Sequence, residues 1–280
     1  PIGGVSEVID RDRAWMAELA AELHLPFEAP DELRIRRMFG AQQLDGNRDT
    51  RVRIPREMHR RRRAFAQLSL DRVTPGQIID AYPDLVMSHT ATWRSVSVMK
   101  KIGAKRLYDP NRLAIVLDHI SPAKTEKYAA DQQTSRNFAR EYGIEKFYDV
   151  DAGIAHLVLM EHGHVKSGDL IVGTDSHCTI YGALGALGSG IGYTEVASVW
   201  VTGKLWMKVP TTVKLTLSGR FAAGVSAKDL MLHLIGTLGA DGCGYKSVEF
   251  YGSALPQMSM SERMTVANLA MEMGSKCVFI

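Results

Sequence analysis

The densest group of chemically reactive side chains in this sequence lies at residues 173–177, which read Gly-Thr-Asp-Ser-His. The group follows an apolar run at 170–172 that is typical of a buried strand. Open α/β sheets bind ligands at strand ends, and Asp175, Ser176 and His177 supply a carboxylate, a hydroxyl and an imidazole. The run therefore indicates acid–base chemistry, although the same residues would also serve simply to cap the next helix.

Three shorter pieces carry the same types of side chain. Asp118 and His119 follow another apolar run, and His156 stands at the expected start of a helix. Asn268 and Glu272 are four residues apart, which places them on one face of a predicted helix. Taken singly each piece is unremarkable, because an isolated histidine is more often a structural residue than a functional one.

A glycine-rich stretch follows the Asp-Ser-His group. Residues 188–192 read Gly-Ser-Gly-Ile-Gly, which does not match the G-x-G-x-x-G pattern of a dinucleotide site. The stretch also comes after the polar group rather than in a strand-to-helix turn. Close packing of a helix on a sheet explains these glycines better.

Composition limits the protein class. The chain has 280 residues, 45% hydrophobic and 23% charged, with a formal net charge of +3. These values exclude a disordered or fibrous protein and imply no nucleic-acid or membrane partner for the chain as a whole. We find neither a signal-peptide pattern nor an apolar run of roughly 20 residues, so we expect no membrane span. Cys178, Cys243 and Cys277 form no disulfide framework, which favours a reducing compartment and predicts a cytoplasmic protein.

The N-terminal part has a different composition. Its first lysine is Lys100, and residues 51–63 hold seven arginines against Glu57. This run is either an anion or nucleic-acid site or a face that meets solvent or an acidic partner. It lacks the interleaved aromatic residues of a stacking platform, which favours the second interpretation. Residues 8–25 have the periodicity of an amphipathic helix.

From residue 74 onward, short apolar strands alternate with amphipathic helices, a pattern that predicts a layered α/β fold. The expected strands are 114–117, 146–150, 170–172, 211–217 and 247–251, and the expected helices are 125–142, 154–162, 227–238 and 261–273. The sequence pattern of strands and helices changes near residue 209. We therefore expect an unassigned Arg-rich segment (1–74), a layered α/β/α first domain (75–208) and part of a second, smaller α/β domain (209–280).

The polar pieces, taken in order and with their spacing, resemble the aconitase superfamily over residues 75–280. The closer resemblance is to the N-terminal portion of 3-isopropylmalate dehydratase large subunits. It implies an aconitase-like fold and a hydro-lyase of amino-acid biosynthesis. Such an enzyme dehydrates and rehydrates a hydroxy di- or tricarboxylic acid, such as an isopropylmalate, at a [4Fe-4S] cluster.

The resemblance also implies roles for the polar residues. Asp118 and His119 form an acid pair, and two further carboxylate–imidazole pairs surround the reacting group. The implied catalytic residues are Asp118, His119, His156 paired with Asp175, and His177 paired with Glu272, and the implied substrate-binding residues are Ser176 and Asn268. A carboxylate partner fixes the tautomer of an imidazole and raises its basicity.

The sequence departs from the family in three places. Cys178 replaces a threonine, and Ser88-His89-Thr90 replaces a Gln-Asp or Asn-Asp pair that makes a substrate or cluster contact in the family. The chain also has no Cys-x-x-Cys, so we assign no metal ligand in it. We expect the cluster ligands beyond residue 280, a small subunit or swivelling C-terminal domain as partner, and no activity from this chain alone.

Two alternatives stay open. Another member of the superfamily, of the homoaconitase or dimethylmalate dehydratase type, would carry the same residues. The second alternative is a protein that has lost the cluster and binds RNA or an acidic partner through residues 51–63. Such a protein has no need of the imidazole and carboxylate set.

Overall fold

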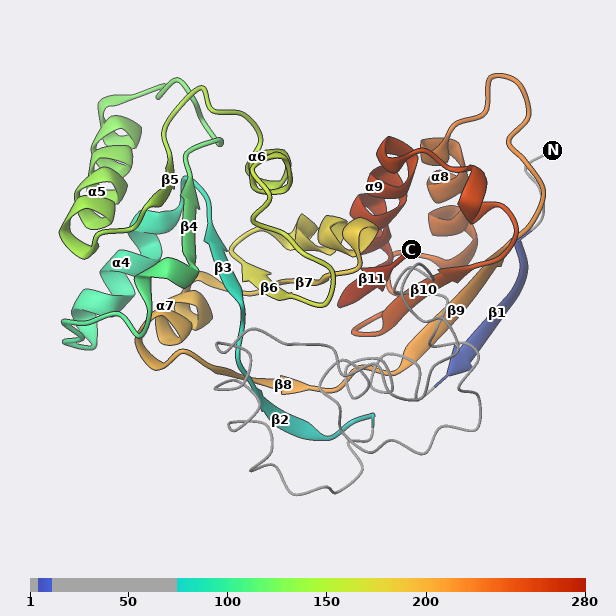
Figure 1. Cartoon of the computed structure of the whole chain (residues 1–280), viewed down its shortest axis with the longest axis horizontal. Coiled ribbons are helices and arrows are strands. Elements are labelled where there is room, and N and C mark those ends of the chain that lie inside the picture. Colours follow the sequence, from blue (N-terminus) through green and yellow to red (C-terminus); the bar gives the residue numbers. More distant parts are fainter. Residues whose placement is uncertain (1–4, 12–74) are drawn as a thin grey trace, which may run out of the picture.

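The computed structural model describes residues 5–11 and 75–280 and shows a mixed α/β protein with two main sheets (Figure 1). The first part of the described chain holds β2 (Ile78–Ala81), β3 (Leu85–Ser88), α4 (Thr92–Lys101), η1 (Pro110–Arg112), β4 (Leu113–Val116), α5 (Glu126–Tyr142), β5 (Lys146–Tyr148), α6 (Ala155–Glu161), β6 (Leu170–Gly173), η2 (Ser176–Leu184), β7 (Leu187–Gly190), α7 (Tyr193–Thr202) and β8 (Leu205–Lys208). The second sheet and its helices comprise β1 (Val5–Arg11), β9 (Thr212–Leu217), α8 (Ala227–Leu238), β10 (Ser247–Tyr251), η3 (Leu255–Gln257), α9 (Met260–Leu269), η4 (Ala270–Met273) and β11 (Cys277–Phe279).

The larger sheet has five parallel strands in the order β5-β4-β3-β6-β7. Strands β3 and β4 are buried at every position, as expected for a parallel sheet covered on both faces. Alternate residues point to opposite layers. Val86 and Ile115 pack with α4, α5 and α7, whereas Met87 and Val116 pack with α6 and η2. This arrangement confirms the expected α/β/α layers (Figure 1).

Capping residues explain why the predicted helices form where they do. Thr125 accepts a hydrogen bond from the backbone N–H of Tyr128 at the start of α5, and Gly143 ends that helix in the left-handed conformation. Helices α8 and α9 both begin with capping boxes, formed by Ser226 with Asp229 in α8 and by a second Ser-x-x-Glu in α9.

The smaller sheet has the order β1-β9-β10-β11, with α8 and α9 packed on it through a shared apolar core (Figure 1). Strands β9, β10 and β11 are parallel, and β1 pairs antiparallel with β9. The expected helix over residues 8–25 is therefore wrong for residues 8–11. That segment contains the adjacent β-branched residues Val8 and Ile9 and pairs with β9 at the sheet edge, which outweighs its helical periodicity. Residues 12–25 and the arginine run at 51–63 lie outside the described residues.

Glycines allow the two sheets to approach each other. A Cβ on Gly182 in η2 would lie 1.8 Å from the carbonyl oxygen of Val278 in β11. A Cβ on Gly188 in β7 would lie 1.9 Å from the carbonyl oxygen of Cys178. The expected close packing is present, although the element that packs on strand β7 is the 3-10 segment η2 and not an α-helix. Between the sheets, β2 and β8 form an antiparallel pair. The predicted boundary near residue 209 stays a prediction.

No helix in the described ranges has both the length and the apolar character needed to cross a bilayer.

Candidate active site

The polar residues of the sequence follow three adjacent strands in the middle of the parallel sheet. His89 follows β3, Asp118 and His119 follow β4, and Asp175 follows β6. The chain adds β4 and β5 on one side of β3 and then β6 and β7 on the other, so the strand order reverses at β3. Such a reversal leaves a crevice at the carboxyl ends of the strands, where α/β proteins bind ligands.

Asp118 fixes the orientation of the His119 imidazole ring. The Nδ1–H of His119 donates to Asp118 Oδ1 at 2.7 Å, and the other carboxylate oxygen accepts the backbone N–H of Ala155 at 2.8 Å. The hydroxyl of Thr90 accepts the backbone N–H of His119 at 2.8 Å. These contacts leave Nε2 of His119, whose side chain is half exposed, as the nitrogen that faces the site.

The loop that carries this pair is itself anchored. Ile120, directly after His119, has φ of +54°, a left-handed conformation that costs a β-branched residue energy. The side-chain amide of Gln132 in α5 donates to the carbonyl oxygen of Ile120 at 3.1 Å. Gln132 is 3% exposed, so the helix fixes the loop from within the core.

Asp175 lies at the centre of the site. Its Oδ1 accepts the Nε2–H of His156 at 3.0 Å and the backbone N–H of His177 at 2.8 Å, and its Oδ2 lies 3.7 Å from His119 Nε2. Burial acts to raise the pKa of Asp175, but the hydrogen bonds from His156 and His177 outweigh it and hold that pKa well below its ordinary value. Asp175 is therefore an ionised acceptor that contacts three imidazoles.

His156 has no ring nitrogen free. Its Nε2–H donates to Asp175, and its Nδ1 accepts the hydroxyl proton of Tyr181 at 3.0 Å. Tyr181 is fully buried, and burial raises its pKa well above the ordinary value, so the hydroxyl keeps its proton. His156 thus acts on Asp175 by holding it in place. Sequence reasoning missed Tyr181 because it lies in an apolar, glycine-rich stretch that has no polar pattern.

The third pair joins the two sheets. The Nε2–H of His177 donates to Glu272 Oε1 at 3.2 Å, and Ser176 Oγ lies 3.3 Å from His177 Nδ1. Glu272 lies in η4, because the expected helix 261–273 is α-helical only to Leu269 and then tightens into a 3-10 turn. Asn268, on α9, forms no hydrogen bond to this group in the part of the chain that the structure describes.

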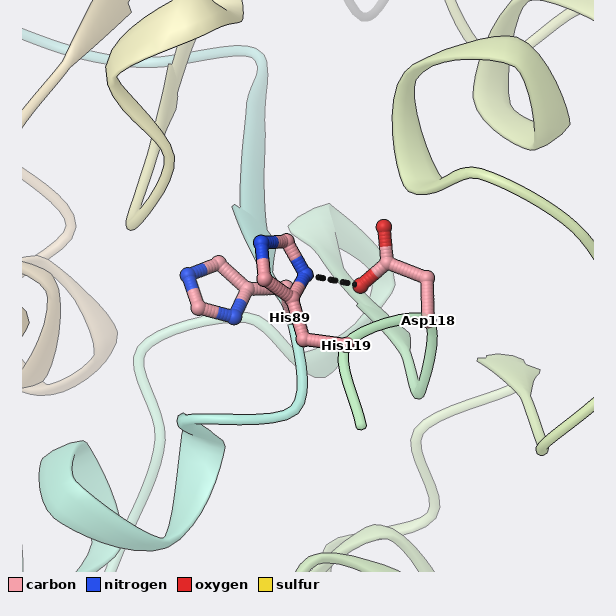
Figure 2. A group of neighbouring side chains, drawn as sticks. All are labelled: His89, Asp118 and His119. Atoms are coloured by element: carbon pink, nitrogen blue, oxygen red, sulfur yellow. Dashed lines mark hydrogen bonds and ion pairs between the residues drawn. The ribbon is translucent and has the colours of Figure 1, made fainter. Parts of the chain in front are cut away.

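His89 is a site residue that sequence reasoning treated only as a departure. Its ring stacks on that of His119, with centroids 4.3 Å apart and planes 23° from parallel, while Asp118 holds the far side of His119 (Figure 2). Burial, and then the charge of His119, lower the pKa of His89, so the neutral ring predominates near pH 7. The position of His89 directly after strand β3 is the sequence signal that could have identified it.

His89, Asp118 and His119 could be considered as metal ligands, because one donor atom from each lies within 4.8 Å of the others. The two rings, however, are stacked, so their in-plane lone pairs run nearly side by side instead of converging on one point. Asp118 Oδ1 also already accepts a proton from His119. The geometry fits hydrogen bonding and proton transfer better than coordination.

The cysteines do not fit an iron–sulfur cluster, which needs thiolates that converge on it. All three cysteines are free and fully buried. Burial raises the pKa of Cys277 to about 12 and also raises that of Cys178, so both stay protonated. Cys277 lies in strand β11, and Cys178 packs against Gly173 in the core of the first sheet.

Together these contacts form one network of imidazoles and carboxylates at a sheet switch point. It contains an imidazole tethered by a carboxylate (His119), a second one bound to a carboxylate from the other sheet (His177), and an ionised carboxylate between them (Asp175). Such a network can give and take protons at neighbouring positions of a small polar substrate.

Comparison with known proteins gives the same family as the motifs. The family model described as "Aconitase family (aconitate hydratase)" matches residues 65–280. The 3-isopropylmalate dehydratase large subunit of Acetivibrio thermocellus is 44% identical over 209 residues, covering 74% of this chain and 50% of that protein. Large subunit 1 of the same enzyme from Methanopyrus kandleri is 44% identical over 202 residues, with coverage of 72% and 48%.

A relative that is named for a different substrate is equally similar. A protein of Methanosarcina mazei described as a "Probable methanogen homoaconitase large subunit" is 45% identical over 194 residues, covering 69% of this chain and 50% of that protein. The chain spans about half the length of the relatives that it matches. The family model nevertheless covers well over half of these 280 residues. The chain belongs to the aconitase family.

Proposed function

We propose that this chain is part of the large subunit of a hydro-lyase that removes water from a hydroxy di- or tricarboxylic acid and adds it back at a neighbouring carbon. The observation that carries the proposal is the convergence of three imidazole–carboxylate pairs around Asp175. Family membership and the names of the relatives support it.

In this proposal His119 donates the proton that the departing hydroxyl needs. Asp118 holds the ring by Nδ1, so Nε2 exchanges the proton with the substrate. Asp175 lies 3.7 Å from that nitrogen and stabilises the positive ring before the proton leaves. Asp175 keeps this position because His156, itself fixed by Tyr181, binds its other oxygen. His177, bound to Glu272, serves a second proton position on the opposite side of Asp175.

Members of the aconitase family use a [4Fe-4S] cluster. The buried thiols of this chain do not fit one, so we assign no step to a cluster here. We propose that the complete enzyme carries its cluster on thiolates that this chain does not supply. We also propose a small subunit or swivelling domain as partner, because relatives are named large subunits. Free, reduced cysteines suit a cytoplasmic protein.

The substrate is the finer part of the proposal. An isopropylmalate is our first choice, and a homoaconitase-type acid is the alternative, because relatives of both names are 44–45% identical. The residues described above act on the hydroxyl and the proton that both substrates share. They therefore support the reaction class more strongly than either substrate.

The test is turnover by the complete large subunit with its small subunit, prepared without oxygen, on a panel of isopropylmalate, homocitrate and dimethylmalate. Ultraviolet absorbance of the unsaturated acid follows the reaction. Replacing His119 with Gln should lower kcat at least about 100-fold, the usual contribution of a general acid. Replacing the exposed His233 of α8 with Gln is the matched control and should change nothing.

Absence of dehydration for every acid on the panel would overturn the proposal, as would full activity of the His119→Gln enzyme. The 280-residue chain alone, treated with iron and sulfide, should bind no stable cluster and show no turnover. A stable cluster absorbance from that chain would contradict the assignment of its cysteines.

A further inference from the structure

A cavity of about 410 Å³ lies next to the proton-transfer residues and is not used by them. Its lining has hydroxyl groups, glycine backbone and one cation. The residues that matter here are Thr174, Ser176, Ser189, Gly190, Gly192 and Lys276. The cavity shares Ser176 with the Asp-Ser-His group and therefore meets the reaction site directly.

Gly190 connects the cation to that group. A Cβ on Gly190 would lie 2.8 Å from both Asp175 O and Ser176 Cα, so its backbone lies against the loop. The ammonium of Lys276 donates to the carbonyl oxygen of the same Gly190 at 3.1 Å. Gly190 therefore contacts both the ammonium of Lys276 and the loop that carries Ser176.

Lys276 has no anionic partner among the described residues. Its other contact is the ring of Tyr245, 5.5 Å from the ammonium. Glu195 faces the same region from α7, but it folds back over Gly192 and forms no ion pair with Lys276 within the described ranges. Burial lowers the pKa of Lys276 more than any neighbouring group raises it. A partly buried ammonium held only by a carbonyl and a ring is costly unless an anion joins it.

Ser189 gives a second, independent sign of a missing partner. Its side chain is fully buried in β7 and lines the same cavity. Its hydroxyl has no hydrogen-bond partner in the part of the chain that the structure describes. Buried hydroxyls almost always have a partner, so this one calls for an acceptor or donor within the cavity.

From these contacts we infer that the cavity is a carboxylate subsite in which Lys276 is the counter-cation and Ser189 and Ser176 are hydroxyl donors. The inference rests on the proposed function, because it takes the occupant to be the second carboxylate of the hydroxy diacid. That carboxylate would anchor the substrate with its hydroxyl toward Asp175 and the imidazoles. Lys276 is then a binding and specificity residue that selects acids with two carboxylates.

The first experiment titrates the 280-residue chain with malate while NMR follows the backbone amides of Gly190 and Gly192. The comparison ligand is 2-hydroxybutyrate, in which a methyl group replaces the second carboxylate, and inorganic phosphate is the third probe. Malate should shift these amides and bind at least about 10-fold more tightly than 2-hydroxybutyrate, as expected for a hydrogen-bonded charge pair.

Variants assign the effect to the ammonium. Lys276→Met keeps most of the aliphatic stem and should weaken malate binding at least about 10-fold, and Lys276→Arg should bind malate more tightly than Lys276→Met. Lys228→Met, on the exposed face of α8, is the matched control and should bind as the unchanged chain does. Equal binding of malate and 2-hydroxybutyrate, or unchanged malate binding in Lys276→Met, would overturn the inference. Preferential binding of phosphate would overturn the assignment to a carboxylate.

The complete enzyme separates this inference from the proposed function. There Lys276→Met should raise KM for the diacid about 10-fold and change kcat much less. If the enzyme is active and KM does not change, the subsite is wrong and the reaction class stands. If malate binding depends on Lys276 but the enzyme dehydrates no acid, the reaction class is wrong and the subsite stands.

Discussion

Gly182 offers a sharp test of how the two sheets are held together. It lies in η2, where a Cβ would be 1.8 Å from the carbonyl oxygen of Val278 and 2.7 Å from its carbonyl carbon. Both obstacles are backbone atoms of β11, which is buried and hydrogen-bonded to β10. Replacing Gly182 with Ala therefore cannot be relieved by turning a side chain.

The geometry sets the size of the effect. The added carbon falls 1.6 Å short of the 3.4 Å at which ordinary contact begins, so η2 and β11 must separate by about that distance. Overpacking a buried contact usually costs about 1–3 kcal/mol, and a clash with two backbone atoms belongs at the upper end. We expect Gly182→Ala to lower the free energy of unfolding by about 3 kcal/mol and Tm by roughly 6–12 °C.

Gly236 is the matched control. It lies inside α8, has open space where a Cβ would go, and needs no left-handed conformation. Gly236→Ala should therefore raise stability by about 0.5–1 kcal/mol through helix propensity. Urea unfolding followed by circular dichroism measures both variants. Equal midpoints for Gly182→Ala and the unchanged chain would refute the packing argument, and a destabilised Gly236→Ala would show that the control site is not open.

Three further changes test the site. Tyr181→Phe leaves the buried Nδ1 of His156 without a donor and should cost about 1–3 kcal/mol in urea unfolding; no loss would mean that this hydrogen bond is not formed. The pKa of Asp175 is lowered in the folded state, so its contribution to stability is present above about pH 4 and is lost as the pH falls below that value. The free energy of unfolding of Asp175→Asn should therefore fall less steeply below pH 4 than that of the unchanged chain, and parallel curves would contradict this. Glu272→Gln should lower kcat/KM of the complete enzyme about 100-fold with an unchanged circular dichroism spectrum, and normal turnover would remove the His177–Glu272 pair from the mechanism.

Local signals were strong enough to predict strands β4, β5 and β6 and helices α5 and α6. The helix at 125–142 has an N-cap threonine and a C-terminal glycine, and the structure begins and ends it at those residues. Asp118 and Asp175 could be placed at strand ends because each follows a short apolar run, which reads as a buried strand. Strand β7 was missed because its Leu-Gly-Ser-Gly sequence has low β-propensity and is held by its neighbour β6.

What the sequence could not supply is contact between distant segments. His177 and Glu272 are 95 residues apart, and family resemblance, not local pattern, suggested that they pair. The stacking of His89 on His119 depends on β3 and β4 being neighbours in the sheet. The single helix expected at 261–273 failed for a similar reason. Its last turn tightens into η4 before Gly274 returns the chain to the sheet, a change that periodicity does not reveal.

The site therefore depends on the two sheets to different degrees. The Asp118–His119 and His156–Asp175 pairs are built within the first sheet and its covering helix. Glu272 reaches His177 from η4, and Lys276 reaches Gly190 from the position just before β11. Both residues lie on the second-sheet side of the Gly182–Val278 contact. A change that separates η2 from β11 must move Glu272 and Lys276 away from the first sheet together, whereas the Asp118–His119 pair has no member in either element. For this reason Gly182→Ala should impair the second proton position and the anion cavity more than it disturbs His119.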